Sequence, residues 1–423
     1  MKRLAVLLLI ALTAVTVFAQ NNTAIPTSLS PAEQNMAAAR KLIDKNPKNY
    51  EAYNALALAL SRRARETSDV RYYAEGESAL QKSFEIAPDN FDGKRIQVWL
   101  LLGKHEFAAA LAEAKKLNQK MPDDVMVYGF LTDANVELGN YKDAETAAQW
   151  MLNLKPANQP GVTRAAYLRE LFGDIDGALD LMNMAYQSNP PTQVEDGAWI
   201  LSQMAHLNLA IGNLDLAEKE LNRALAMFPG YHYALGNLAK VRIQQKRYDA
   251  AVELLTQRYQ AAPHAENLYG LAGALQLAGR NDEARKAFAE FEQKSLLETG
   301  RADNSNHELI FYYTDYADRP DKALAVAQRE IGRRHDVHTL DCYAWALYTN
   351  GQYAEARAQI EGALAVGIRE ASIFRHAGEI ALKAGDKPAA ERYLREAVRL
   401  NTLGSEQAAV TLARLENPSK MAR

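Results

Sequence analysis

The sequence predicts an all-α protein: a right-handed solenoid of stacked helical hairpins, with about ten repeats and a capping helix. Alanine and leucine dominate its 423 residues, whereas Gly (23) and Pro (14) are modest in number, which favours helix. Glycine recurs with alanine five residues later, as in Gly139 and Ala144. Prolines recur every 34 residues, a period typical of helix-turn-helix repeats, at Pro88, Pro122, Pro156 and Pro190.

Apolar residues within one period mark two helices that face each other. The first helix has apolar residues on one face at Ile200, Met204, Leu207 and Ile211, and the second at Leu214, Ala217, Leu221, Ala224 and Leu225. Between them Gly212 can adopt the left-handed conformation that ends a helix and lets the chain reverse. We therefore expect an antiparallel hairpin.

Small and helix-breaking residues set the shape of each unit. An alanine methyl lets two helix axes approach closely, and a proline near the end of the second helix stops it. Alanine follows the turn at positions 144, 178, 217, 251, 284, 323, 356 and 390. A larger side chain there would push the two helices apart.

The repeats divide the chain as follows. We expect an opening helix at about 32–46, a solenoid to residue 404 and a closing helix at 405–416. The units are 49–89, 90–123, 124–157, 158–191, 192–230, 231–263, 264–299, 300–336, 337–370 and 371–404. Four units depart from the pattern: the first has a long turn, and the others have Lys246 or ADRP where a turn glycine is expected, or Thr402 in place of the closing proline.

The chain resembles tetratricopeptide repeat proteins of exported bacterial type. The pattern is a large residue early in the first helix, a turn glycine, an alanine and a closing proline. It is matched by Tyr128, Leu131, Gly139, Tyr141, Ala144 and Pro156, and again by Leu340, Tyr343, Ala344, Gly351, Tyr353 and Ala356. The resemblance implies a non-enzymatic scaffold that binds proteins or peptides on a concave wall formed by the first helix of each unit.

The N-terminus has the pattern of a secretory signal peptide at residues 1–19. MKR is positive, the apolar run from Leu4 to Ala19 is short of the roughly 20 residues that a membrane helix needs, and Val17 and Ala19 are small. We expect cleavage after Ala19 and a periplasmic or extracellular protein without membrane insertion. An uncleaved anchor is the alternative. Residues 20–31 are expected to be a flexible leader, and residues 417–423 a disordered tail.

Charge and cysteine content restrict the classes of function. The formal net charge is −3 and no basic patch occurs, which argues against nucleic-acid binding. A single cysteine, Cys342, cannot form an internal disulfide and is expected to be buried. The oligomeric state cannot be predicted.

No motif predicts catalysis or a cofactor: G-x-S-x-G, a Walker-type loop and H-E-x-x-H are all absent. The nearest candidate for a metal site is HDVHTLDC, with His335, His338, Asp341 and Cys342. These residues could bind a transition metal. We expect instead that they form a turn and the start of the next helix, and we predict no metal.

Alignment of the units by their turns assigns residues to the concave wall. The candidates for partner binding are Asp133, Glu137, Tyr167, Trp199, His206, Lys240, Tyr269, Tyr312, Trp345 and Arg375. Aromatic side chains in a groove provide large contact areas, although some are expected to pack between helices. No unit has the Lys/Asn pair with which some tetratricopeptide domains hold a C-terminal carboxylate.

Three functions remain open. The first is an interaction scaffold in the cell envelope, and the second is a periplasmic part of a machine that exports or assembles polysaccharide or outer-membrane proteins. The third is an enzyme that is metal-dependent or acts on glycans.

Overall fold

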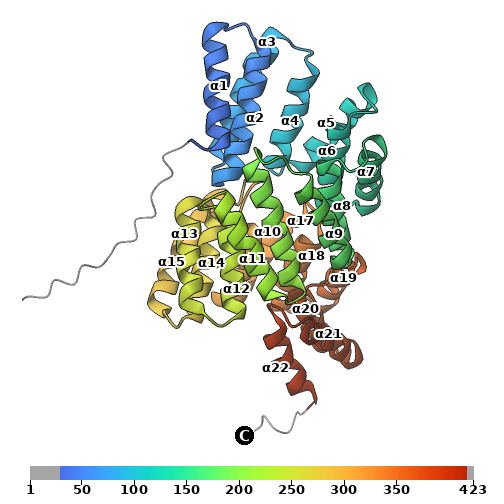
Figure 1. Ribbon diagram of the computed structural model, residues 1–423. Helices are drawn as coiled ribbons and strands as arrows, with labels where there is room; N and C mark the ends of the chain where they lie inside the picture. Colours follow the sequence, from blue (N-terminus) through green and yellow to red (C-terminus); the bar gives the residue numbers. More distant parts are fainter. Residues whose placement is uncertain (1–28, 417–423) are drawn as a thin grey trace, which may run out of the picture.

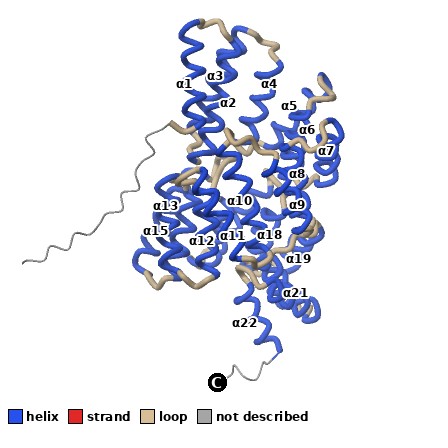
Figure 2. The backbone as a smooth tube through the Cα atoms, in the orientation of Figure 1, coloured by secondary structure: helices blue, strands red, loops and turns tan. Residues whose placement is uncertain are grey.

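The computed structural model describes residues 29–416, in which 22 α-helices and one π-helical segment occur without any strand. The predicted signal peptide, most of the predicted leader and the predicted tail lie outside this range. Figure 2 shows the all-helical chain. The helices are α1 (Pro31–Lys45), α2 (Tyr50–Thr67), α3 (Arg71–Ile86), α4 (Phe91–Gly103), α5 (Phe107–Lys120), α6 (Val125–Glu137), α7 (Tyr141–Leu154), α8 (Gln159–Leu171), α9 (Ile175–Gln187), α10 (Val194–Ala210), α11 (Leu214–Met227), α12 (His232–Gln244), α13 (Tyr248–Ala261), α14 (Ala265–Leu277), α15 (Asn281–Glu298), α16 (Asn306–Phe311), η1 (Tyr312–Tyr316), α17 (Pro320–Ile331), α18 (Val337–Thr349), α19 (Tyr353–Ala365), α20 (Ala371–Lys383), α21 (Lys387–Leu400) and α22 (Ser405–Glu416).

Consecutive helices pair as the ten predicted hairpins, from α2 with α3 to α20 with α21, and α1 and α22 flank them. The small residues lie where the two helices of a pair touch: Ala144 and Ala217 are 0% exposed. Because each hairpin has an apolar face that it cannot bury alone, stacking of neighbours forms the core. The predicted fold class is confirmed.

Each hairpin turn contains a residue with positive φ, which ends the first helix and reverses the chain. Lys246 has a φ of 60° and Asp318, in ADRP, has a φ of 49°, so both take the conformation that glycine takes elsewhere. The turn residues are Ser68, His105, Gly139, Gly173, Gly212, Lys246, Gly279, Asp318, Gly351 and Gly385. Four of these ten residues are not glycine, so the departures from the glycine pattern change the residue and preserve the hairpin.

The solenoid coils back upon itself along a line of contacts that we call the seam. Each of four successive hairpin turns touches a loop much further along the chain. That loop directly follows the hairpin that lies five positions after the one containing the turn. His105 faces Asp303 at 3.7 Å, and a Cβ on Gly139 would lie 2.8 Å from the His335 carbonyl oxygen. The next two turns bring Gly173 to Gly367 and Gly212 to Asn401. One coil of this superhelix therefore takes just over five hairpins.

Figure 1 shows the path of the coil, from the blue α1–α4 at the top through α10–α15 to the red C-terminal helices below. The N-terminal hairpin packs against α10, in the middle of the chain. The Arg65 guanidinium of α2 donates a hydrogen bond of 2.7 Å to Asp196 of α10. His232 of α12 hydrogen-bonds the Arg65 carbonyl oxygen at 2.9 Å. The N-terminal hairpin thus covers part of the concave wall. In the part of the chain that the structure describes, no helix is both long and apolar enough to cross a membrane.

Candidate functional site

The inner side of the coil forms a partly open cavity of about 1170 Å³, which we call the chamber. Its wall is formed mainly by the first helices of the hairpins, as the alignment of units predicts. Ligand pockets usually measure about 300–1,000 Å³, so the chamber is large enough for more than a small molecule. Seven aromatic side chains line it: Tyr73, Trp99, Phe107, Phe130, Tyr167, Trp199 and Tyr233.

The chamber also carries charge, with six carboxylates and four guanidinium groups in its lining. Most of these cations already have partners. Arg164 donates from Nε to Asp133 Oδ1 at 2.7 Å, and Arg65 binds Asp196 and the buried Glu195. The carboxylates in the lining are Asp133, Glu137, Glu170, Asp196, Glu266 and Asp303.

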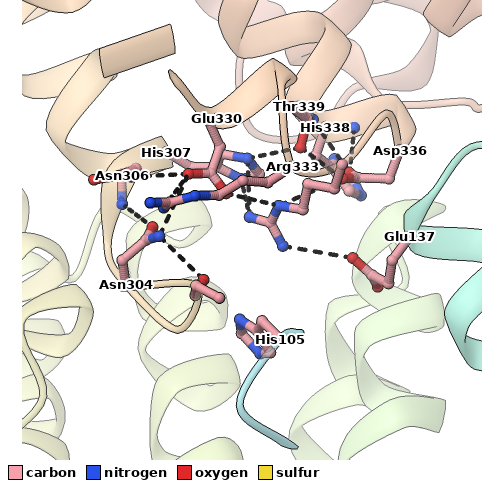
Figure 3. A network of polar contacts seen from close by, with 12 residues as sticks. His105, Glu137, Asn304, Asn306, His307, Glu330, Arg333, Asp336, His338 and Thr339 are labelled. Carbon is pink, nitrogen blue, oxygen red and sulfur yellow. Dashed lines mark hydrogen bonds and ion pairs between the residues drawn. The ribbon is translucent and has the colours of Figure 1, made fainter. Parts of the chain in front are cut away.

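Arg334 lines the chamber and also contacts residues of the seam. Its guanidinium lies 3.2 Å from Glu330 Oε1, 3.6 Å from Asp336 Oδ2 and 3.5 Å from Glu137 Oε2. The neighbouring His335 N–H donates to the Glu137 carbonyl oxygen at 3.0 Å. Figure 3 shows Glu137 reaching from α6 toward the polar cluster around Glu330 and Asp336. This cluster fastens one coil to the next.

Burial raises the pKa of Glu137 to about 7, and the nearby Asp336 carboxylate adds to the shift. Arg334 opposes the shift, but Glu330 and Asp336 share the same guanidinium. Burial acts to raise the pKa of Asp336, but Arg334 and the hydrogen bond from Thr339 act against it, and the pKa of Asp336 is lowered. Because Glu330 and Asp336 share the Arg334 guanidinium with it, Glu137 is the carboxylate of these three that takes up a proton near neutral pH.

Histidines within the coil are held neutral where burial and cations surround them. Burial and then Arg334 lower the pKa of His105 to about 4 and that of His307 to about 3. His307 also receives a hydrogen bond at 3.0 Å from Arg334 and lies 2.9 Å from the Thr339 hydroxyl. At neutral pH neither ring neutralises a nearby carboxylate.

Four of the predicted wall residues line the chamber: Asp133, Glu137, Tyr167 and Trp199. Tyr167 is 37% exposed although it lies inside the coil, so its ring is free to meet a ligand. Trp199 is partly buried against the core formed by α8–α12. The structure brings these four side chains together from α6, α8 and α10.

Two further candidates lie close to this group. His206 places Nε2 2.7 Å from Glu170 Oε1, and Glu170 lines the chamber. Lys240 is exposed on the inner side of the coil. Loss of hydration inside the coil, and then repulsion from Arg258, lower the pKa of Lys240. The carboxylates of Glu370, Glu266 and Glu170 act on it in the opposite direction.

The remaining four candidates lie outside the chamber lining and pack against protein. Tyr269 contacts Phe291 with ring centroids 5.2 Å apart, and Tyr312 packs on Phe288 at 5.4 Å. Trp345 is 5% exposed, and its Nε1 donates to Asp315 at 2.8 Å. The guanidinium of Arg375 lies 5.0 Å from the centre of the Trp345 ring.

The histidine, aspartate and cysteine residues of HDVHTLDC turn toward different partners. Asp341 bonds His376 at 2.7 Å, His338 lies 3.7 Å from Glu370, and Cys342 is 2% exposed. Across residues 29–416, no three His, Cys, Asp or Glu side chains are grouped so that they could hold a metal ion.

Several chamber residues were missed by the sequence alignment. Tyr233 could have been found, because it stands seven residues before Lys240 on the same helical face. Tyr73 belongs to the second helix of its hairpin, and His105 and Asp303 belong to connections. Because the units were aligned only over their first helices, the alignment could not identify these three residues.

Comparison with known proteins identifies the repeats. Two tetratricopeptide repeat family models match residues 209–263 and 344–405. A tetratricopeptide repeat-containing protein of Methanocaldococcus jannaschii is 25% identical over 164 residues, which cover 38% of this chain and 27% of that protein. The match therefore spans little more than a quarter of that relative.

Solved structures share the fold at low identity. A monomeric mutant of IFIT1 with Gppp-AAAA has a TM-score of 0.51 and 15% identity, covering 88% of this chain and 90% of that one. The human IFIT1 dimer with m7Gppp-AAAA has a TM-score of 0.50 and 14% identity, covering 86% and 85%.

The fold and its inner chamber define a helical-hairpin solenoid whose repeats form an extended inner surface. The two matched stretches are tetratricopeptide repeats, and hairpins of the same kind precede and separate them. Tetratricopeptide repeats generally serve as scaffolds for protein–protein interaction.

Proposed function

We propose that this protein is an exported, non-enzymatic scaffold of the cell envelope that holds an extended segment of a partner protein in its chamber. The observation that carries the proposal is the aromatic lining of the chamber, with seven rings around about 1170 Å³. Aromatic side chains give large contact areas and lose little conformational freedom on binding, so they are effective anchors for a peptide.

Polar groups in the chamber would fix the direction of the bound segment. Thr163, Gln159 and Gln203 line the same cavity as Tyr167 and Trp199, and their side chains can hydrogen-bond a peptide backbone. An extended segment leaves its backbone N–H and C=O groups free to make such bonds. A chamber with both kinds of group therefore suits a peptide better than a purely apolar ligand.

The charge of the chamber favours a protein partner over a nucleic acid. The related IFIT1 structures contain Gppp-AAAA and m7Gppp-AAAA. In this chain the six lining carboxylates outnumber the four guanidinium groups, and Arg65 and Arg164 are already paired. Phosphate groups would meet net negative charge, which opposes their binding.

The proposed location rests on the N-terminal sequence. A positive start, an apolar run and small residues at Val17 and Ala19 support export with cleavage after Ala19. N-terminal sequencing of the protein from cells tests this step. A start at Gln20 is the expected result, and an intact Met1 in a membrane fraction would contradict it.

Site-specific photo-cross-linking in cells tests the scaffold. A benzophenone side chain replaces either Tyr167, which is 37% exposed inside the chamber, or Trp150, which is 47% exposed on α7 outside the chamber lining. The two positions match in size and exposure. We expect a partner adduct from position 167 and little from position 150.

Mass spectrometry of the adduct should then place one short stretch of the partner at position 167. Adducts from position 150 alone would move the binding surface to the outer face. Absence of adducts from either position, with protein exported at normal levels, would contradict the scaffold itself.

A further inference from the structure

One corner of the chamber is built from five separate elements. It consists of Tyr73 of α3, His105 of the α4–α5 turn, Tyr233 of α12, Glu266 of α14 and Asp303 of the α15–α16 connection. All five line the same cavity, and His105 Nδ1 lies 3.7 Å from Asp303 Oδ1. We call these five residues the corner.

The carboxylates of the corner lack matching cations. Asp303 is 3.7 Å from His105, whose lowered pKa keeps the ring neutral. Glu266 has one cation, Arg258, at 3.1 Å. Next to them, Glu298 lies 3.8 Å from His264, and its Oε2 is buried without a hydrogen-bond partner.

Glu308 of α16 adds a further negative charge beside the corner, and within residues 29–416 it forms no ion pair. Burial, and then repulsion from Glu266, raise its pKa to about 7. Burial also raises the pKa of Asp303 to about 6, with Glu298 and Glu266 adding to the shift and His264 and Arg301 opposing it. Among the described residues, Arg258 is the one guanidinium that forms an ion pair with any of these four carboxylates, and it pairs with Glu266. Arg301 and Arg334 act on Asp303 and Glu308 without pairing with them.

Two tyrosine rings complete the corner. Tyr73 packs so closely on the chain that a Cβ on Gly103 would lie 2.6 Å from its ring. Tyr233 is fixed by His232, with ring centroids 4.0 Å apart. Faces of aromatic rings attract cations, and more strongly where water is partly excluded. Carboxylates and ring faces in one cavity thus select the same kind of ligand.

We propose that the corner binds a positively charged side chain, lysine or arginine, of the segment held in the chamber. The inference rests on the proposed function and specifies the partner: an extended segment with a basic residue. A lysine or arginine there would reach Asp303 and Glu266 with its charge and pack its aliphatic stem on the tyrosine rings. It would give Asp303 a charged ion-pair partner, which the neutral His105 ring does not provide.

Fluorescence titration with short peptides tests the proposal, because Trp99 and Trp199 line the chamber and report its occupancy. The probes are Gly/Ser peptides that differ in one central residue: lysine, arginine, acetyl-lysine or norleucine. We expect the lysine and arginine peptides to bind at least about tenfold more tightly than the other two. Equal binding of lysine and acetyl-lysine peptides would overturn the proposal.

Substitutions test which carboxylates contact the bound cation. Asp303→Asn and Glu266→Gln should each weaken binding of the lysine peptide by about tenfold. Glu283→Gln should leave the affinity unchanged, because Glu283 is exposed and pairs with Arg280. A folded Asp303→Asn protein that binds as tightly as the wild type would overturn the assignment. Spermidine that binds more tightly than any lysine peptide would show a site for free polyamines, and would also overturn it.

Proton release provides an independent readout. A cation beside Asp303 favours its ionised form, so binding at about pH 6 should release protons, and calorimetry in two buffers of different ionisation enthalpy measures them. Binding without proton release in the wild type would count against Asp303. If cross-linking from position 167 captures a segment with no basic residue, the scaffold stands and this inference fails.

Discussion

The backbone N–H of Val337 donates a hydrogen bond of 3.0 Å to the hydroxyl of Tyr141, across 196 residues of chain. Tyr141 begins α7 in the first coil, and Val337 begins α18 in the second. The same contact region contains the pair of Glu137 with Arg334 at 3.5 Å. These links join the first coil of the solenoid to the second. The joined coils line the chamber with their concave side.

Glycines of the seam should be less tolerant of substitution than glycines in other turns. Gly173 and Gly279 have φ values of 83° and 74°, but a Cβ on Gly173 would lie 2.6 Å from the Gly367 carbonyl oxygen, whereas Gly279 has open space. Alanine at either position costs about 1–2 kcal/mol of backbone strain. Gly173→Ala should lower the melting temperature further, as circular dichroism can measure. Equal losses in the two variants would argue against close contact at the seam.

The alanines between paired helices should not accept larger side chains. Ala217 is 0% exposed in α11, so Ala217→Leu must push α10 and α11 apart, at a cost of about 1–3 kcal/mol. Ala226→Leu in the same helix lies on an exposed position and serves as the control. Denaturant unfolding followed by circular dichroism compares them. An Ala217→Leu protein as stable as the control would contradict the packing of the hairpins.

Arg65 should hold the N-terminal hairpin on the rest of the coil. It pairs with Asp196 and with Glu195, which is 7% exposed and also accepts a hydrogen bond of 2.7 Å from Tyr231. Arg65→Ala leaves Glu195 buried without its cation, at a cost of about 1–3 kcal/mol. Hydrogen exchange should then accelerate in α1–α3.

Arg71→Ala provides the matched control for this loss of charge, because Arg71 is 84% exposed and pairs only with the nearby Asp69. It should leave the exchange of α1–α3 unchanged. Acceleration spread evenly over the whole chain in Arg65→Ala would show that Arg65 does not act locally.

Glu137 should make stability depend on pH near neutrality. Its pKa is raised to about 7 in the folded protein, so protonation favours the fold. This contribution stabilises the protein as pH falls through about 7 toward the usual range of a carboxyl, and is lost as pH rises. Glu137→Gln should reduce the slope of melting temperature against pH between about 5 and 7, whereas Glu283→Gln should not. An unchanged slope in Glu137→Gln would refute the assignment.

Local features were predictable from the sequence because they depend on residues near each other in the chain. The glycine at 139, the alanine at 144 and the proline at 156 define one hairpin, and the hairpin forms where they predict it. The conformation of Lys246 shows the limit of such patterns: its φ of 60° is imposed by the hairpin, since the turn contains no glycine.

The seam could not be predicted in the same way. Its contacts depend on a small rotation at each hairpin that accumulates over five units, and no single residue encodes that sum. Asp133 and Tyr167 line the chamber, where the alignment of units predicts a wall, but the contact between the two coils is not encoded in that alignment. Trp345 was assigned to the wall by the same periodicity, but it is buried by Asp315 and His376 of neighbouring units.

Disulfide trapping across the seam tests the contact between the coils most directly. A Cβ on Gly139 would lie 3.2 Å from the His335 Cβ, close to the separation of about 3.5–4.5 Å that a disulfide requires. The native Cys342 is buried and alone in the chain. With Gly139→Cys and His335→Cys together, mild oxidation should give an intramolecular disulfide in nearly all molecules, seen by mass spectrometry of the linked peptides. Two thiols that stay free or pair only between molecules, in a double variant that keeps the helical signal and melting temperature of the wild type, would contradict the contact between the coils and the chamber that depends on it.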